Sequence, residues 1–445
     1  MPPKLLTEVS LTRAIFQLSW PAITSMMLIN VFNLVDAFWV GKLGTVALGG
    51  MTASAFLVWC FHAGGQLVGT GVTALVARRV GETRPGEAGL AGGHGLVLAL
   101  LMAGVVMAVG LPLQGPVLRS LGLDPGVIQA GMDYLTPILL GFPLVTLWYG
   151  VDAIFRGSGD TRSPMQILAI ALLFNVVLDP LFIFGVGPLP PMGIAGAGWA
   201  TVLAHALGVS MGLMWLRHRD IKPHLGGERL DPGILGSLMR IGSPIGVTGL
   251  LFSLIYLALT PIIASTGSSA VAAIGVGHRL EGISYFSCMG FSTAAATLVG
   301  QYLGAGKPDL AARAAWTTTA LSGGVLAVIA LTFLLFAPWL MSIFSSDPEV
   351  IAQGALYLRI VAICEVAMAP ELVLEGAFSG AGNSMPPMIV GVPLTAARIP
   401  LAYFLARGLG WGAAGIWWAI SGTTLLKGAA MILWFKTGRW KRTQV

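Results

Sequence analysis

Long apolar segments recur along the chain, with short polar connections between them. Each is about as long as a helix must be to cross the hydrocarbon core of a bilayer, which takes roughly 20 residues. The segments run over residues 14–40, 46–75, 88–112, 127–155, 164–187, 192–217, 237–263, 269–299, 311–337, 350–378, 387–406 and 411–436. The alternation of apolar and polar residues that marks a membrane β-barrel is not seen. The pattern therefore predicts an all-α membrane protein with twelve transmembrane helices.

The two halves of the chain repeat each other. Residues 74–85 align with residues 297–308 at an offset of 223, and residues 155–165 align with residues 378–388 at the same offset. Each half holds six spans, an even number, so both copies have the same orientation in the membrane. We therefore expect two six-helix lobes related by a pseudo-twofold axis along the membrane normal. Rocking of the lobes would expose the cleft between them to either side.

The longest polar connection, residues 217–240, joins the sixth and seventh spans. A mid-chain polar segment is the natural boundary between two repeated halves. We therefore predict an N-lobe at residues 1–220, a cytoplasmic linker at 221–236 and a C-lobe at 237–445.

Composition and charge agree with a lipid environment. The chain is 56% hydrophobic and only 10% charged, too little charge to cover a soluble surface. Eighteen Lys and Arg residues, Lys4 and Arg229 among them, flank one face of the predicted bundle, whereas three (Lys42, Arg119 and Arg407) flank the other. This bias predicts a multi-pass protein of the plasma (inner) membrane with both termini in the cytoplasm. It also accounts for the net charge of +6, so no nucleic-acid partner is expected.

Two aspartates lie inside spans of the first half and have apolar counterparts in the second. The repeat aligns Asp36 with Leu259 and Asp179 with Ala402. A charge inside the membrane costs at least ~2.5–3.5 kcal/mol on insertion scales, so an acid found in one half only is expected to have a function. Both lie in the outer part of their spans, where they can face each other and bind a proton or a monovalent cation. The alternative is a structural pair bonded to backbone or to a neighbouring helix.

Asn175 and Thr201 are the polar neighbours expected at this cation-coupling site. Asn175 precedes Asp179 by four residues, so the two share one face of a helix. Its amide oxygen can bind a cation or orient the carboxylate, and Thr201 in the sixth span is the weaker fourth candidate. A Na⁺ ion would be held by Asp36, Asn175 and Asp179, and no other metal site is expected.

The second half carries its own set of charges inside apolar spans. The acids Glu281, Glu365 and Glu371 have apolar counterparts in the first half. Together with Glu375 they are matched in number by four basic residues, Arg279, Arg359, Arg398 and Lys427. Equal and opposite numbers favour a paired network, since unpaired charges in a membrane are costly. The alternative is a substrate site or a second cation site that includes Glu281, Glu365, Glu371 and Arg398.

Two further features recur at equivalent positions. Pro21 and Pro244 lie within the first and seventh spans, and a proline removes one helical hydrogen bond and permits bending. A hinge at Pro21 and a static kink are the two alternatives. Asp152 and Glu375 also align, and we expect them to form salt bridges near the ends of their spans.

Three sequence motifs carry a family resemblance: Phe155–Met165, Asn33–Asp36 followed by Phe38–Gly41, and Asn175–Pro180. With them the chain resembles the multidrug and toxic compound extrusion (MATE) family almost end to end. It is most similar to the DinF-like branch, because the seventh span lacks the glutamate of the NorM branch. The resemblance implies proton or sodium antiport through the N-lobe and export of lipophilic, often cationic, drug-like compounds by alternating access.

Two other functions are alternatives for a chain of this kind. A flippase for lipid-linked substrates, from the same superfamily, would need a cationic central cavity. An intramembrane lipid-modifying enzyme would need a catalytic constellation, and none of the relevant motifs is present. We therefore expect a transporter without a cofactor, working as a monomer on small lipophilic molecules among membrane lipids.

Overall fold

The computed structural model describes residues 10–185, 187, 190–224 and 230–443. Lys4, Arg229 and residues 225–229 of the predicted linker lie outside this range. The regular structure of the described residues is helical, in agreement with the predicted all-α class. The α-helices are α1 Leu11–Gly41, α2 Thr45–Gly81, α3 Pro85–Ser120, α4 Pro125–Leu140, α5 Phe142–Ser158, α6 Arg162–Phe184, α7 Ile194–Arg217, α8 Pro232–Ala264, α9 Ser268–Gly304, α10 Pro308–Ser342, α11 Pro348–Glu365, α12 Met368–Gly380, α13 Met385–Ala396, α14 Arg398–Tyr403 and α15 Ala413–Lys436. A π-helical turn, η2 Phe404–Gly408, follows α14, and a 3₁₀ turn, η3 Arg439–Arg442, follows α15.

Ten helical segments of the described chain are long and apolar enough to cross a membrane. Two further spans are bent helix pairs, α4 with α5 at 54° and α11 with α12 at 52°. Counting each pair as one span confirms the twelve predicted spans, although the sequence did not predict the bends. The first turn of α5 contains Pro143 and that of α12 contains Pro370. A proline there lacks the N–H that would continue the preceding helix, which explains a break at each place.

The helices pack into two compact units. Among the described residues, unit 1 contains residues 24–246, and unit 2 contains residues 10–23 and 247–443. The unit boundaries therefore fall inside α1 and α8, at positions related by the repeat offset of 223. Each boundary follows two residues after a proline, Pro21 in α1 and Pro244 in α8. The predicted lobes at residues 1–220 and 237–445, with a linker at 221–236, stay a prediction.

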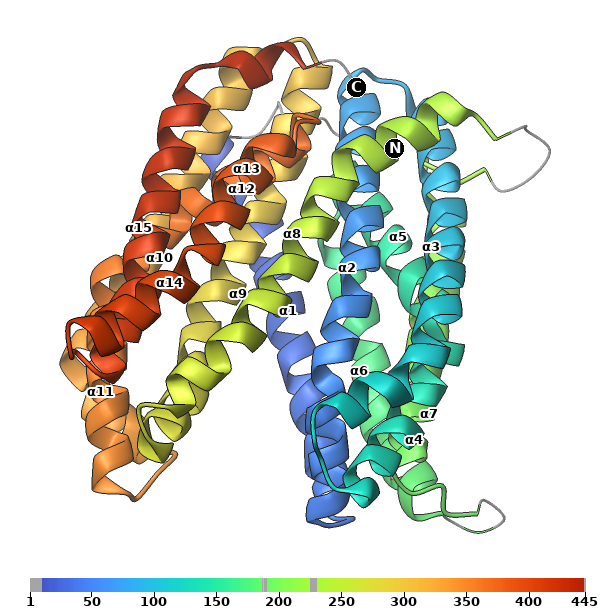
Figure 1. Ribbon diagram of the computed structural model, residues 1–445. Coiled ribbons are helices and arrows are strands. Elements are labelled where there is room, and N and C mark those ends of the chain that lie inside the picture. Colours follow the sequence, from blue (N-terminus) through green and yellow to red (C-terminus); the bar gives the residue numbers. More distant parts are fainter. Residues whose placement is uncertain (1–9, 186, 188–189, 225–229, 444–445) are drawn as a thin grey trace. The chain divides into compact units, whose positions relative to one another are not determined.

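Small residues bring helices close together in the same way in both units. In unit 1, α2 packs against α5, and a Cβ atom at Gly157 would lie 2.9 Å from the carbonyl oxygen of Thr73. In unit 2, α9 packs against α12 (Figure 1), and a Cβ at Gly380 would lie 2.1 Å from the carbonyl oxygen of Ala296. The four residues form two pairs related by the same offset of 223. The duplication read in the sequence thus extends to individual packing contacts.

Candidate cation site

Asp36 of α1 and Asp179 of α6 come together inside unit 1. Their side chains are 2% and 0% exposed, and the two carboxyl groups interact directly. Thr201 of α7 lies 3.2 Å from Asp36 through its hydroxyl oxygen and Asp36 Oδ2. Asn175 donates a hydrogen bond of 3.2 Å from Nδ2 to Asp179 Oδ1 and also interacts with Asp36. The structure therefore brings together the four side chains that the sequence analysis predicted for the cation-coupling site.

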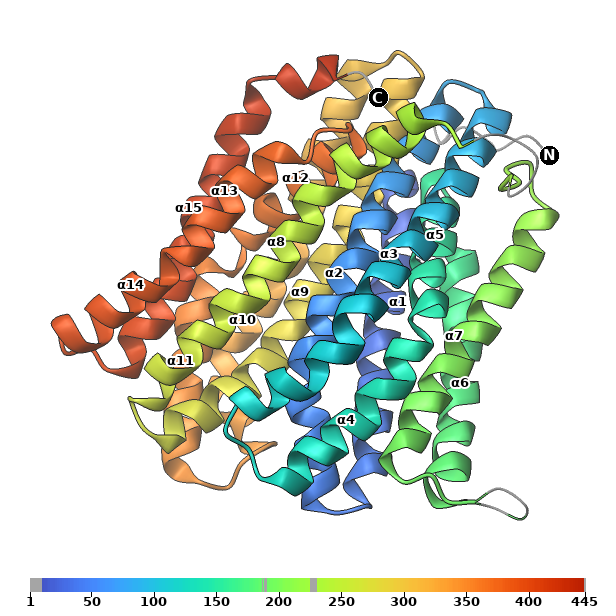
Figure 2. The ribbon, with the colours of Figure 1, turned by 45° about the vertical axis from the view of Figure 1, so that its right-hand side comes forward.

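Close packing of α6 and α7 positions this group. Figure 2 shows the two helices side by side. A Cβ at Gly196, near the start of α7, would lie 2.6 Å from the backbone of Phe182. Only glycine allows that approach. Thr201 follows little more than one turn further along α7, and the close packing brings it to the level of Asp36 and Asp179.

Three oxygen atoms of the group have no hydrogen-bond donor within the described residues. They are Asp36 Oδ1, Asn175 Oδ1 and Asp179 Oδ2, and all three are fully buried. A buried acceptor without a partner is costly, and three of them on side chains that interact with one another form an oxygen-rich set of negative character. Hard monovalent cations and protons are the species that such oxygens bind. No cluster of three or more His, Cys, Asp or Glu side chains with metal-binding geometry occurs in the described part of the chain.

The Thr201 hydroxyl can respond to the state of Asp36. Its oxygen lies within bonding distance of Asp36 Oδ2 and, at 3.0 Å, of the Ala197 carbonyl oxygen, but it has a single proton to donate. When Asp36 is ionised, the hydroxyl can donate to the carboxylate. When Asp36 holds a proton, the acid can donate to Thr201, and Thr201 to the Ala197 carbonyl.

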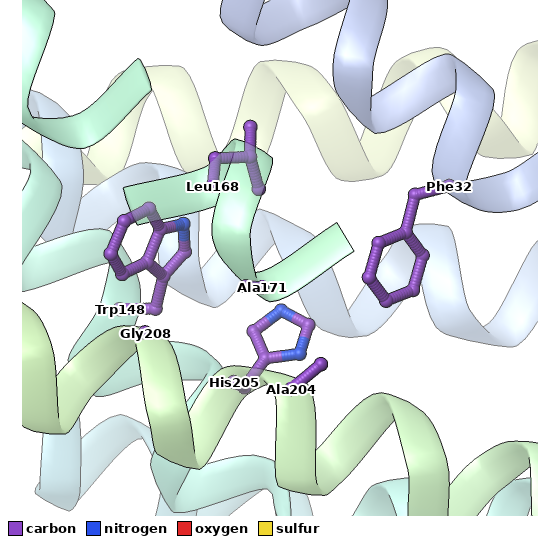
Figure 3. A pocket seen from close by; sticks show the side chains of 7 residues that line it. All are labelled: Phe32, Trp148, Leu168, Ala171, Ala204, His205 and Gly208. Carbon is purple, nitrogen blue, oxygen red and sulfur yellow. The ribbon is translucent and has the colours of Figure 1, made fainter. Parts of the chain in front are cut away.

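A small pocket lies one helical turn from Asp36 and Thr201. It has a volume of about 20 Å³, enough for roughly one water molecule. Figure 3 shows its lining, which consists of Phe32 of α1, Trp148 of α5, Leu168 and Ala171 of α6, and Ala204, His205 and Gly208 of α7. Phe32 precedes Asp36 by four residues and His205 follows Thr201 by four. His205 was not predicted from the sequence as part of a site, because nothing in its spacing links it to Asp36.

The charges of the second half meet in unit 2. Of the four acids predicted there, Glu371 is the one that forms an ion pair with a lysine, while His278 Nε2 lies 4.0 Å from Glu281 Oε2. Lys427 of α15 forms an ion pair with Glu371 of α12. Glu281 of α9 instead accepts a hydrogen bond from the hydroxyl of Tyr357. Arg398 is 2% exposed and bonds neutral groups, with hydrogen bonds of 2.8 Å to Thr423 and to Tyr256. The tyrosine partners were missed because a count of charges does not include neutral hydroxyl groups.

Glu365, at the bend between α11 and α12, is 1% exposed, and neither of its carboxylate oxygens accepts a hydrogen bond of regular geometry within the described residues. The hydroxyl of Ser284, on α9, is buried beside Glu365 and interacts with it, although no hydrogen bond of regular geometry joins them. The repeat places Phe142 and Phe61 at the equivalent positions of unit 1, where the two rings pack edge to face at 6.1 Å. Unit 2 therefore has polar groups where unit 1 has a hydrophobic contact. Whether this cluster is a network, a substrate site or a second cation site stays a prediction.

Of the remaining predicted residues, Glu375 borders the unit 2 cluster, and the others lie apart from both clusters. Asp152 forms an ion pair of 2.8 Å with Arg156 in unit 1, whereas its counterpart Glu375 interacts electrostatically with Glu371 and Lys427. Arg279 and Arg359 are exposed. Pro21 lies within α1, in the part that belongs to unit 2.

The fold and the buried carboxylates define a multi-pass helical membrane protein built from two repeated halves. The family model MatE matches residues 21–181 and again residues 244–404, once in each half. The chain therefore belongs to the MatE family. Proteins of this family are membrane transporters, and this chain is one of them and not an enzyme.

Individual relatives span nearly the whole chain. A probable multidrug resistance protein NorM of Thermotoga maritima is 26% identical over 97% of this chain and 94% of its own length. A FAD transporter of Shewanella oneidensis is 27% identical over 89% of this chain and 88% of its own length. A crystal structure of MATE in the bent conformation has the same fold, with a TM-score of 0.91 at 22% identity over 98% of this chain and 97% of that one. These relatives leave the assignment to the DinF-like branch as a prediction from the sequence.

Proposed function

We propose that the protein is a proton- or sodium-coupled antiporter that exports lipophilic, cationic drug-like compounds by alternating access. The observation that carries the proposal is the set of three buried oxygens without donors on Asp36, Asn175 and Asp179. Such a set is stabilised when a proton or Na⁺ binds, so occupation of the site changes the free energy of unit 1. Thr201 acts as the fourth ligand or as a donor to Asp36.

Coupling follows if the two access states differ in their affinity for the cation. A ligand shifts a conformational equilibrium only by its difference in affinity between the two states. Release of the proton or Na⁺ would leave carboxylates buried beside each other, and a state that admits water to the site would then be favoured. The position of Pro21 near a unit boundary in α1 supports a hinge in the same helix that carries Asp36.

The class of cargo comes from the relatives and the resemblance. The Thermotoga relative is named a probable multidrug resistance protein, while the Shewanella relative is named a FAD transporter. The names of these relatives therefore point to drugs in one case and to FAD in the other. The preference for lipophilic cations, the monomeric state, the inner membrane and the cytoplasmic termini are parts of the same proposal, supported by the motifs and by the distribution of Lys and Arg.

The test is efflux of a fluorescent lipophilic cation from proteoliposomes under a proton gradient alone and under a sodium gradient alone. We expect Asp36→Asn and Asp179→Asn to insert normally and to lose gradient-driven efflux. Asp133→Asn, which neutralises an exposed aspartate of α4 in the same unit, is the matched control and should transport at the wild-type rate. Wild-type efflux by Asp36→Asn under both gradients would overturn the proposal. Efflux driven by one gradient only would identify the coupling ion.

A further inference from the structure

The connection between α7 and α8 lies in a groove on α3. A Cβ atom at Gly89 would lie 2.3 Å from the carbonyl oxygen of Lys222, and one at Gly93 would lie 2.0 Å from that of His224. The amide of His224 also donates to the Gly89 carbonyl at 3.4 Å. Because Gly89 and Gly93 are four residues apart, they form one face of α3, and the backbone of residues 222–224 occupies the space that side chains would fill.

The repeat shows that this groove is specific to the first half. The counterparts of Gly89 and Gly93 in α10 are Ala312 and Trp316. The Trp316 ring fills its position and packs against Phe435 with ring centroids 5.4 Å apart. The two glycines are thus not part of the shared scaffold, and the segment that they accommodate is the connection itself.

His94 holds the other end of the same connection. It is 4% exposed, and its Nε2 accepts a hydrogen bond of 2.8 Å from the backbone amide of Asp231. Its Nδ1 lies 2.9 Å from the carbonyl oxygen of Leu90. A carbonyl oxygen only accepts, so Nδ1 carries the proton, and Nε2 is the acceptor of a neutral imidazole.

Asp231 in turn caps α8. Its carboxylate Oδ1 accepts from the amide of Gly233 at 2.7 Å, and its carbonyl oxygen accepts from Leu235 at 3.1 Å. The hydrogen bond from Asp231 to His94 therefore ties the first turn of α8 to α3. That first part of α8 belongs to unit 1, while the part after Gly246 belongs to unit 2.

We propose that residues 221–224 and 231 form a proton-sensitive strap, latched by His94, that holds the start of α8 on unit 1. A proton on Nε2 removes the only acceptor that His94 offers to Asp231, and the amide then faces an N–H. Among the described residues of the connection, Lys222, His224 and Asp231 are the charged or titratable ones that contact this part of α3. The neighbouring glycines, Gly92 and Gly95, face Ile154 of α5 and Val72 of α2, which are apolar. Acidification of the compartment that bathes this face releases the latch, and a rise in pH restores it.

The strap is distinct from the cation site and does not require transport to be tested. Hydrogen–deuterium exchange of the peptide covering residues 230–240 is measured in the full-length protein in detergent at pH 5.5 and pH 8. Each rate is normalised to an unstructured reference peptide, which removes the intrinsic pH dependence of exchange. In the wild type we expect protection to fall roughly five- to tenfold at the lower pH, the effect of losing about one hydrogen bond.

Two variants separate the latch from general destabilisation. His94→Gln keeps an acceptor that does not titrate, so protection should be retained at both pH values. Gly93→Ala places a methyl group against the His224 carbonyl and should lower protection at both pH values. His218→Gln removes an exposed histidine of the same connection and should behave like the wild type. A His94→Gln profile with the same pH dependence as the wild type, or unchanged protection in Gly93→Ala, would overturn the proposal whatever the outcome of the efflux assay.

Discussion

At the scale of single residues, the two units treat buried charge differently. Within the described residues, unit 1 keeps two carboxylates beside each other with no base bonded to them, whereas unit 2 gives Glu371 a lysine and Glu281 a tyrosine. Removing one member of a buried ion pair leaves the other charge without compensation, and that is costly. A neutral substitution at the ion pair of unit 2 should therefore lower the free energy of unfolding. In unit 1 it should not, because there it removes one of two neighbouring carboxylates.

For the Lys427–Glu371 pair, Glu371→Gln is expected to destabilise the protein by about 3 kcal/mol. Lys427 would remain buried, with a side-chain exposure of 5%, and without its partner. Glu375 also interacts with Lys427 and should offset part of the loss. Unfolding in detergent followed by a fluorescent thiol or tryptophan signal measures the effect.

The double variant Glu371→Gln with Lys427→Met is the control for that measurement. It removes both charges and should recover most of the stability lost by the single change. Equal destabilisation by the single and the double variant would show that the lysine is stabilised by something other than Glu371.

At the scale of helices, close contacts between small residues set the packing. In unit 2, Gly380 of α12 lies against the backbone of α9 at Ala296, and the equivalent contact in unit 1 joins Gly157 to Thr73. Without a hydrophobic effect between helices in lipid, such contacts contribute through van der Waals packing. Glycine is needed where another backbone would touch the Cβ.

Gly380→Ala is therefore expected to lower the free energy of unfolding by roughly 1–3 kcal/mol. The backbone that meets the new methyl group cannot move aside as a flexible side chain can. The matched control is Gly324→Ala in α10, where a Cβ meets no atom within 4 Å. There the same substitution should be neutral or stabilising by up to ~1 kcal/mol, since alanine favours the helix. Melting curves of the two variants in one detergent give the comparison, and a drop of equal size in both would contradict the packing argument.

At the scale of the whole molecule, α1 and α8 are the helices that contribute to both units. Each crosses from one unit to the other two residues after a proline, at positions related by the repeat. A proline leaves a missing hydrogen bond in the helix, which lowers the cost of bending there. Motion of one unit against the other would require bending at these places.

Pro21→Ala should restore a regular helix and slow efflux severalfold while leaving thermal stability unchanged or raised. Pro338→Ala, in a helix that lies wholly in unit 2, is the matched control and should transport at the wild-type rate. Initial rates in proteoliposomes measure the effect. A full rate for Pro21→Ala would indicate a static kink in place of a hinge.

The sequence by itself determined the spans, the duplication, and the half of the chain that holds the two aspartates without acidic counterparts. Apolar length reports a membrane crossing directly, and a constant offset of 223 reports the repeat without any structural information. Asp36 and Asp179 were found because their counterparts, Leu259 and Ala402, are apolar.

Only the tertiary structure decided which side chains meet. It brought Thr201 to Asp36, gave Glu281 a tyrosine partner, placed Glu365 beside Ser284, and set the connection against α3. The reason is physical: in lipid the outer face of a helix is as apolar as its packed face, so periodicity does not reveal which side faces inward. Contacts between helices depend on that rotation and on depth, which are set by close packing at residues such as Gly196.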